Sequence, residues 1–199
     1  MSLKSVPFFE YPRLWTDDKE SLTSIIDEVS SSGGFILQKA VSDFEKDLSN
    51  YTGSNFAVGV GNATDGMEIF LEAIGIKPGD EIIISSHTML ATASAIKVNG
   101  GVPVPVEIGY DNLIDPESIE AAISPNTVGI MPTQLNGRTC DMDSISKIAR
   151  KHGLFIVEDA AQALGSKYKN KQAGTFGLAS DISFFPATVL GSLGDAGAV

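Results

Sequence analysis

The chain has 199 residues, 43% hydrophobic and 20% charged, which suits a globular domain with a full core. Its formal net charge of −11 argues against nucleic acid or an anionic membrane as a partner. The single cysteine, Cys140, excludes an internal disulfide, and no apolar run is long enough for a membrane span or a signal peptide, so a cytoplasmic location is expected.

Taken in order, the chain opens with an aromatic, proline-punctuated lead-in at residues 6–15. A helix is expected at 19–31, capped by Asp17 and Asp18, and a second at 40–52, because apolar residues recur there at helical spacing. Both segments predict amphipathic helices that cover a core.

A strand is expected at 56–60, followed by a turn of small and hydroxyl residues at 61–66 and a helix at 67–74. Such a strand–turn–helix can cradle a phosphate, since the exposed N–H groups and the helix dipole favour an anion. Asn, Thr and Asp are also ordinary helix caps, so the turn alone leaves both interpretations open.

The alternation continues to the end of the chain. Expected strands lie at 81–85, 102–106, 127–132 and 154–157, and expected helices begin at 87 and cover 115–123 and 142–152. The prolines of the second of these strands favour a sheet edge or an irregular start of the strand. Strands that alternate with helices predict an α/β fold with a sheet covered by helices.

The stretch 154–199 organises the candidate site. The strand 154–157 ends in acid, and a second strand at 181–186 runs into a turn of small residues at 191–197. Ligands of open α/β sheets bind at the carboxyl ends of strands, and this set suits a cofactor with a basic ring nitrogen and a phosphate. The residues expected to meet there are Asp159, Gln162 and Ser183.

The segments EDAAQALGSKYKNKQAGTFG (158–177) and SFFPATVLGSLGDAGAV (183–199) resemble the DegT/DnrJ/EryC1/StrS family of sugar-nucleotide aminotransferases, which use pyridoxal 5′-phosphate (PLP). The resemblance extends from about Val6 to Val199 and implies a three-layer α/β/α fold, the PLP-binding large domain of the aspartate-aminotransferase type. Because relatives continue further, residues 1–199 are expected to be the N-terminal part of that domain, incomplete at the C-terminus and without the small C-terminal domain.

The resemblance assigns roles to single residues. Asp159 would hold the proton of the PLP ring nitrogen, although a surface acid or helix cap is the alternative, and Gln162 would lie near the 3′-hydroxyl. Met89 stands where the family has a stacking aromatic residue, and a thioether is a poorer platform. Glu158 would support the site or be exposed. No metal site is expected. The phosphate contacts would be Ala63, Thr64 and Ser183.

One position departs from the family. Its motif reads roughly S-F-F/Y-P-x-K-x-L-G, and the lysine binds PLP covalently, whereas this sequence has Thr188. Threonine offers neither an amine that condenses with a carbonyl nor a base with a useful pKa. The resemblance therefore implies an aminotransferase pocket that lacks its catalytic amine.

Three functions remain open. The first is a homodimeric aminotransferase that moves an amino group from glutamate to a keto sugar nucleotide, inactive in this form. The second is a non-catalytic binder of PLP or a sugar nucleotide, and the third is a nucleotide-binding domain without PLP, which the absence of a GxGxxG or GxxxxGK[ST] motif disfavours. The apolar loop 35–37 is a core contact or, as the resemblance implies, a segment near the cofactor across a dimer interface. The segment 194–199 is expected to be a turn that leads into a strand beyond the chain.

Overall fold

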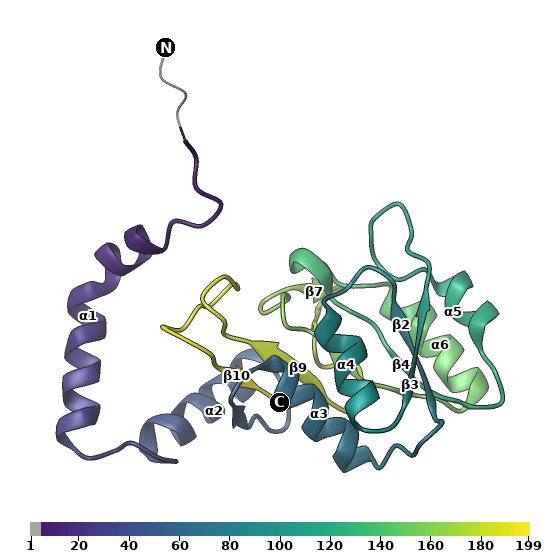
Figure 1. The fold of residues 1–199 in the computed structure, drawn as a ribbon, viewed down its shortest axis with the longest axis horizontal. Coiled ribbons are helices and arrows are strands. Elements are labelled where there is room, and N and C mark those ends of the chain that lie inside the picture. The colour runs from purple at the N-terminus through teal and green to yellow at the C-terminus, as the bar shows by residue number, and fades with distance from the viewer. Residues whose placement is uncertain (1–4) are drawn as a thin grey trace.

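A computed structural model describes residues 5–199 (Figure 1). The first four residues lie outside the described range, and so does the start of the segment that the sequence analysis considered as a signal peptide. Within residues 5–199, no helix is both long and apolar enough to cross a bilayer.

The centre of the fold is one mixed sheet in the order β3-β2-β4-β5/β6-β9-β10-β1. The pieces β5 and β6 are consecutive parts of one strand, joined at Val157, whose N–H donates to the Ile130 carbonyl of β4 at 3.1 Å. The strands are β1 (Gly59–Val60), β2 (Glu81–Ser85), β3 (Val102–Val106), β4 (Thr127–Met131), β5 (Phe155–Ile156), β6 (Glu158–Asp159), β9 (Ser180–Ser183) and β10 (Gly197–Ala198).

Strands β2 to β5 are parallel, β6 is parallel to β9, and β10 runs antiparallel to both of its neighbours. Strand β3 lies at one edge of the sheet, so the edge predicted from Pro103 and Pro105 is confirmed. A proline cannot donate to a neighbouring strand, which is why two of them are tolerated only there.

Helices cover both faces of the sheet, which confirms the predicted three-layer α/β/α fold. On one face α3 (Ala63–Ile74) and α4 (Leu90–Val98) pack against Ile82 and Ile84 of β2. On the other face α5 (Pro116–Ala122) and α6 (Met142–His152) share a core with Ile83. Alternate side chains of a strand point to opposite faces, so one short apolar run serves two cores.

The second helix, α2 (Lys39–Thr52), begins one residue before its predicted start and packs Leu48 against the sheet near β9 and β10. Helix α5 also begins where its capping acid predicts, since Asp115 accepts the N–H group of Ser118. Helix α6 covers the predicted residues, and the structure shows that Asp141 caps it by accepting the N–H group of Ser144. Strong local signals therefore placed these three helices correctly.

Helix α1 (Tyr11–Ser31) corrects the predicted helix at 19–31, because it also includes the second half of the aromatic lead-in, residues 11–15. Pro12 stands in its first turn, where a residue without an N–H is tolerated. Asp17 and Asp18 lie inside the helix and cap nothing. Helix α1 has no buried residue and stands away from the body of the molecule (Figure 1).

Other elements also have bounds that differ from the predicted ones. Helix α3 begins at Ala63 rather than at 67, and α4 begins at Leu90 rather than at 87. The predicted strands 56–60 and 181–186 shorten to the two residues of β1 and the four of β9. Two elements had not been predicted: the hairpin of β7 (Lys167–Tyr168) with β8 (Lys171–Gln172), and the 3-10 turn η1 (Leu135–Gly137).

The expectation that the segment 194–199 is a turn leading into a strand beyond the chain was wrong, because Gly197 and Ala198 of this segment form β10. Gly197 pairs with Val60 of β1 on one side and with Ser183 of β9 on the other. A Cβ atom at Gly197 would lie 2.5 Å from the Asn62 carbonyl carbon, so only glycine allows β10 to approach the start of α3 this closely.

Candidate functional site

The candidate site lies where the ends of β6 and β9 meet the first turns of α3 and α4. Asp159 ends β6 on the α3/α4 face, two residues after Val157, which is buried in the same core. Its side chain is 3% exposed. The alternatives of a surface acid or a helix cap are therefore wrong for this residue.

Hydroxyl groups surround the carboxylate of Asp159. Thr92 Oγ1 of α4 donates to Asp159 Oδ2 at 2.6 Å, and the Ala161 N–H donates to Oδ1 at 3.3 Å. Thr88 Oγ1 lies 3.5 Å from the same Oδ2 and within 2.8 Å of both Thr92 Oγ1 and Thr133 Oγ1. These contacts fix the orientation of the carboxylate from three different segments of the chain.

The electrostatics of Asp159 favour a cationic partner. Burial raises the pKa of its carboxyl group, while the hydrogen bonds from Thr92 and Ala161 pull it down. None of the ion pairs found in residues 5–199 involves this side chain. A buried carboxylate without a counter-charge is stabilised when a cation binds beside it.

The start of α3 supplies the second half of the site. Asn62 caps this helix by accepting the Asp65 N–H at 2.9 Å, and the Gly66 N–H donates to the Asn62 carbonyl. The first N–H groups of a helix have no partner inside it, so those of Ala63 and Thr64 are available to an anion. The dipole of this 12-residue helix adds to the attraction.

Strand β9 links the two halves. Its Asp181 is the in-register neighbour of Asp159, and Ser183 two residues later is the neighbour of Gly197, which abuts the start of α3. The structure therefore brings Ser183 close to the Ala63 end of α3 and Asp159 close to the Thr88–Thr92 end of α4. A basic group and an anion separated by a small ring could bind between these two ends.

Thr188 folds back onto the same strand. Its Oγ1 lies 2.9 Å from the Ser183 carbonyl oxygen and 2.8 Å from that of Phe185, and its N–H also donates to the Phe185 carbonyl. The position is thus beside Ser183, as the motif implies. The hydroxyl group is occupied by its own loop and offers no amine.

Two predicted residues have weaker links to the site. Met89 precedes α4 directly and is 67% exposed, so its thioether covers no part of this chain. Gln162 uses its Oε1 to accept the Asn136 N–H at 3.1 Å, and its carbonyl accepts the Gly137 N–H at 3.0 Å. These bonds tie Gln162 to the η1 turn, and none of the hydrogen bonds found among residues 5–199 joins it to Asp159.

Glu158 is neither exposed nor a direct part of the site. It is fully buried and its two oxygens accept four hydrogen bonds, from Gln134 Nε2 at 2.7 Å and the N–H groups of Gly174, Phe176 and Gly177 at 2.8, 2.6 and 3.0 Å. Gln134 in turn accepts the Cys140 N–H. Burial raises the pKa of Glu158, while these donors favour its ionised form. The residue anchors the loop at 174–177.

Sequence reasoning missed several residues that build the site. Thr88 precedes α4 by two residues and Thr92 lies in its first turn, and their spacing of four positions could have marked them as a pair at the helix start. Thr133 and Asp181 carry no such signal, because only the pairing of strands brings them to Asp159.

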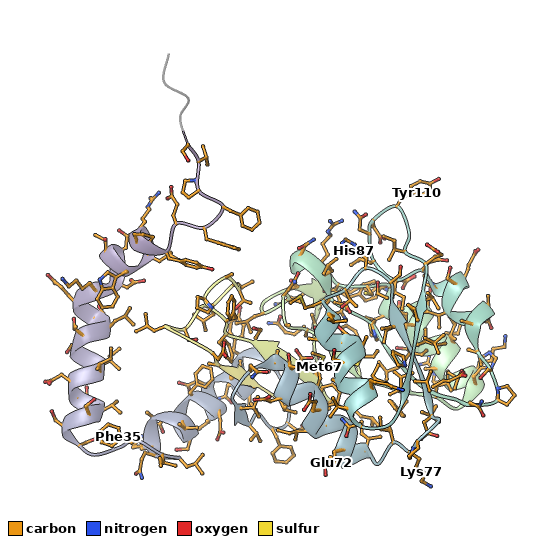
Figure 2. The ribbon with its side chains drawn as sticks, in the orientation of Figure 1. Phe35, Met67, Glu72, Lys77, His87 and Tyr110 are labelled. Atoms are coloured by element: carbon orange, nitrogen blue, oxygen red, sulfur yellow. The ribbon has the colours of Figure 1, made fainter. Side chains whose placement is uncertain are left out.

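The loop 35–37 is not a core contact in this chain. Its three side chains, Phe35, Ile36 and Leu37, are 74%, 75% and 84% exposed. Figure 2 shows Phe35 at the corner between α1 and α2, whereas Met67 of α3 lies within the body of the molecule. The interpretation as an interface segment therefore remains for this loop.

Comparison with known proteins identifies relatives along nearly the whole chain. Residues 16–199 match the DegT/DnrJ/EryC1/StrS aminotransferase family. The chain is 40% identical over 196 residues to the pleiotropic regulatory protein of Geobacillus stearothermophilus, and 38% identical over 195 residues to the dTDP-3-amino-3,4,6-trideoxy-alpha-D-glucose transaminase of Streptomyces venezuelae. These matches cover 98% of this chain and 53% and 52% of the relatives, so the chain spans about half their length.

Solved structures of similar proteins belong to the same family. A DegT DnrJ EryC1 StrS aminotransferase from Brucella abortus superimposes with a TM-score of 0.93 at 34% identity, over 98% of this chain and 54% of that one. NtdA from Bacillus subtilis, solved with its cofactor PMP, gives 0.91 at 36% identity, over 100% of this chain and 45% of that one. The expected aspartate-aminotransferase type of fold is thereby confirmed.

Proposed function

Because this chain belongs to the DegT/DnrJ/EryC1/StrS aminotransferase family, whose members use PLP, we propose that it binds that cofactor at the ends of β6 and β9. Residues 1–199 are then the N-terminal part of the PLP-binding large domain. The activity of the relatives is the transfer of an amino group, and we propose keto sugar nucleotides and glutamate as the substrates of the whole enzyme.

The observation that carries the proposal is the environment of Asp159. The carboxylate is buried, held by hydroxyl groups, and without a cation among residues 5–199, at the strand end that faces two helix N-termini. The ring nitrogen of PLP is a base that accepts a proton, and its phosphate is an anion. The donor set of the site fits both ends of this molecule.

Each residue of the site has a distinct task under this proposal. Asp159 keeps a proton on the ring nitrogen, and Thr88 and Thr92 hold the carboxylate in place. The N–H groups at the start of α3 and the hydroxyl of Ser183 receive the phosphate, and Met89 covers a ring face. Bound PLP supplies an electron sink for amine chemistry.

Thr188 supports a second candidate, a non-catalytic binder of PLP or of a sugar nucleotide. Its hydroxyl group is bonded to the loop carbonyls of Ser183 and Phe185, and it has no nitrogen with which to hold the cofactor covalently. Binding of PLP by the pocket and catalysis with it therefore depend on different residues and are tested separately. A pocket that binds PLP reversibly is compatible with both candidates.

The sugar-nucleotide substrate class comes from the relatives. Besides the Streptomyces enzyme, they include a GDP-perosamine synthase of Caulobacter vibrioides and a UDP-2-acetamido-2-deoxy-3-oxo-D-glucuronate aminotransferase of Pseudomonas aeruginosa. Their sugars carry different nucleotides, so the shared feature is an amino sugar linked to a nucleotide. We propose that this chain acts on the same class of nucleotide-linked sugars and is located in the cytoplasm.

A homodimer is the proposed assembly. Helix α1 buries no side chain within its own chain, although it carries Leu14, Trp15, Ile25 and Ile26. The exposed loop 35–37 continues this apolar surface. Such a surface is stabilised when a second copy covers it. Sedimentation that gives a stable monomer at micromolar concentration would contradict the dimer.

Binding of pyridoxamine 5′-phosphate (PMP) tests the proposal, because PMP needs no lysine. Titration calorimetry would compare the native chain with the Asp159→Asn variant. Loss of one charge-assisted hydrogen bond, about 1.5–3 kcal/mol, should weaken binding about 10- to 100-fold. The exposed Asp27 of α1 supplies a matched control, Asp27→Asn, which should bind as the native chain does. Equal affinity in the native chain and the Asp159→Asn variant would place the ligand elsewhere.

A further inference from the structure

Strand β9 carries a second acid beside the site that the assignments above leave unused. Asp181 is the register neighbour of Asp159 in a parallel pair of strands, so both side chains lie on the face covered by α3 and α4. Asp181 is fully buried. Its Cβ lies 3.3 Å from the position that a Cβ on Gly66 of α3 would take, so the helix packs directly onto it.

Three neighbouring buried acids differ in how they are satisfied. Glu158 accepts four hydrogen bonds, and Asp159 accepts from Thr92 and Ala161. Both oxygens of Asp181 lack a hydrogen-bond partner anywhere in the part of the chain that the structure describes. A buried ionised carboxyl group without a partner is costly, whereas a neutral one is tolerated.

The groups around Asp181 give no positive charge. Strand β6 faces it with Glu158 and Asp159, α3 faces it with Gly66, and Val199 closes the same contact. The nearest acid of α3, Asp65, is bonded to Asn62. Burial first, and then the charge of Asp159, raise the pKa of Asp181 well above its ordinary value.

We propose that Asp181 is a positioning residue of the cofactor site: it carries the one proton of an Asp159–Asp181 pair and so leaves Asp159 ionised to receive the ring nitrogen. This inference rests on the proposed function. The hydrogen bonds from Thr92 and Ala161 decide which acid is ionised, because they stabilise the anion of Asp159 alone.

The protonation of Asp181 sets how many charges face a bound ring cation. With its proton in place, Asp181 is neutral and Asp159 alone faces the ring. An ionised Asp181 would add a second negative charge, and the ring nitrogen would then keep its proton to a higher pH. An asparagine at 181 has the neutral state at every pH.

The direct test is an NMR titration of PMP labelled with nitrogen-15 in its ring, bound to this chain. The nitrogen shift reports the proton on the ring, independently of any reaction. The Asp181→Asn variant keeps position 181 neutral, so its bound ring should lose the proton at the same pH as in the native chain. The Asp27→Asn variant should also titrate as the native chain does. A ring proton lost at least one pH unit lower in the Asp181→Asn variant, a tenfold change, would show that Asp181 is ionised beside the ring and would overturn the proposal.

A second measurement needs no cofactor. A raised carboxyl pKa contributes stability that is complete below the unfolded pKa near 4 and is lost as pH rises toward the folded pKa. The Asp181→Asn variant should therefore gain stability over the native chain as pH rises from 4 to 8, seen in urea midpoints. A constant difference across this range would show that Asp181 carries no proton and would overturn the pair.

The outcomes separate the two levels of inference. If PMP binds but its ring loses the proton at a lower pH in the Asp181→Asn variant than in the native chain, the role of Asp181 fails while the proposed function stands. If PMP at millimolar concentration binds neither protein, the proposed function fails and the role of the pair toward the ring fails with it, whatever the urea midpoints show.

Discussion

The contrast between Glu158 and Asp159 gives the sharpest prediction for folding. The two acids are adjacent and both buried, but Glu158 accepts four hydrogen bonds while Asp159 accepts its bonds mainly from side-chain hydroxyl groups. Replacing Glu158 with alanine leaves three backbone N–H groups and Gln134 Nε2 without an acceptor. At the low value of about 1 kcal/mol for each buried donor, the loss is about 4 kcal/mol.

The matching change at the site should behave differently. In an Asp159→Asn variant the amide oxygen can still accept from Ala161, and the amide group can donate to a threonine hydroxyl. We expect its free energy of unfolding to stay within about 1 kcal/mol of the native value, while PMP binding falls. Because ordinary domains are stable by only about 5–15 kcal/mol, the Glu158→Ala variant should lose a large part of its stability.

Urea denaturation followed by circular dichroism measures both variants at pH 7. The Glu158→Gln variant is a useful intermediate, because it keeps one oxygen acceptor and should lose roughly half as much stability as Glu158→Ala. Equal losses of stability in the Glu158→Ala and Asp159→Asn variants would refute the division into an anchoring acid and a ligand-binding acid.

Two further predictions concern the scaffold. Asp115 accepts the Ser118 N–H and hydroxyl, so the Asp115→Ala variant should lose about 1 kcal/mol of unfolding free energy in urea denaturation. Because the Ser118 hydrogen bond lowers the pKa of Asp115, this contribution is present above the unfolded pKa near 4 and is lost as pH falls through the folded pKa. An Asp115→Asn control that loses as much stability as the alanine variant would argue against capping. At Gly129 a Cβ atom would lie 2.2 Å from the Phe155 ring, so Gly129→Ala should lower the stability by about 1–3 kcal/mol, and an unchanged melting temperature would show that the ring moves aside freely.

Local signals predicted much of the fold. The capping acid Asp115, followed by Pro116, placed the start of α5, since such signals act within a few residues of the helix that they bound. The start of α1 was misplaced because a proline usually interrupts a helix, and the sequence does not show that Pro12 lies in the first turn, where proline is tolerated.

The acid at the end of β6 could be predicted for the site, but its surroundings could not. Thr133 and Asp181 reach Asp159 only through the pairing of strands that are far apart in sequence. The burial of Glu158 depends on the loop at 174–177, which no pattern in the sequence places beneath it. Tertiary pairing therefore supplied the contacts that decide which neighbouring acid binds a ligand and which one holds the fold.

The central claim is that a PLP pocket lies at the ends of β6 and β9 and that Thr188 stands where an amine would complete it. Borohydride treatment with PLP, followed by peptide mass analysis, tests this on the native chain and on the Thr188→Lys variant. Val189 is the adjacent residue and is 67% exposed, so Val189→Lys provides a matched lysine outside the proposed position.

We expect a reduced PLP adduct at residue 188 in the Thr188→Lys variant, preceded by a visible absorbance band, and none on the native chain or at residue 189 in the control. An adduct on another lysine of the native chain, together with activity toward glutamate, would show that the amine is supplied elsewhere. Labelling of the Thr188→Lys variant no stronger than that of the Val189→Lys control would show that the pocket does not present PLP to residue 188.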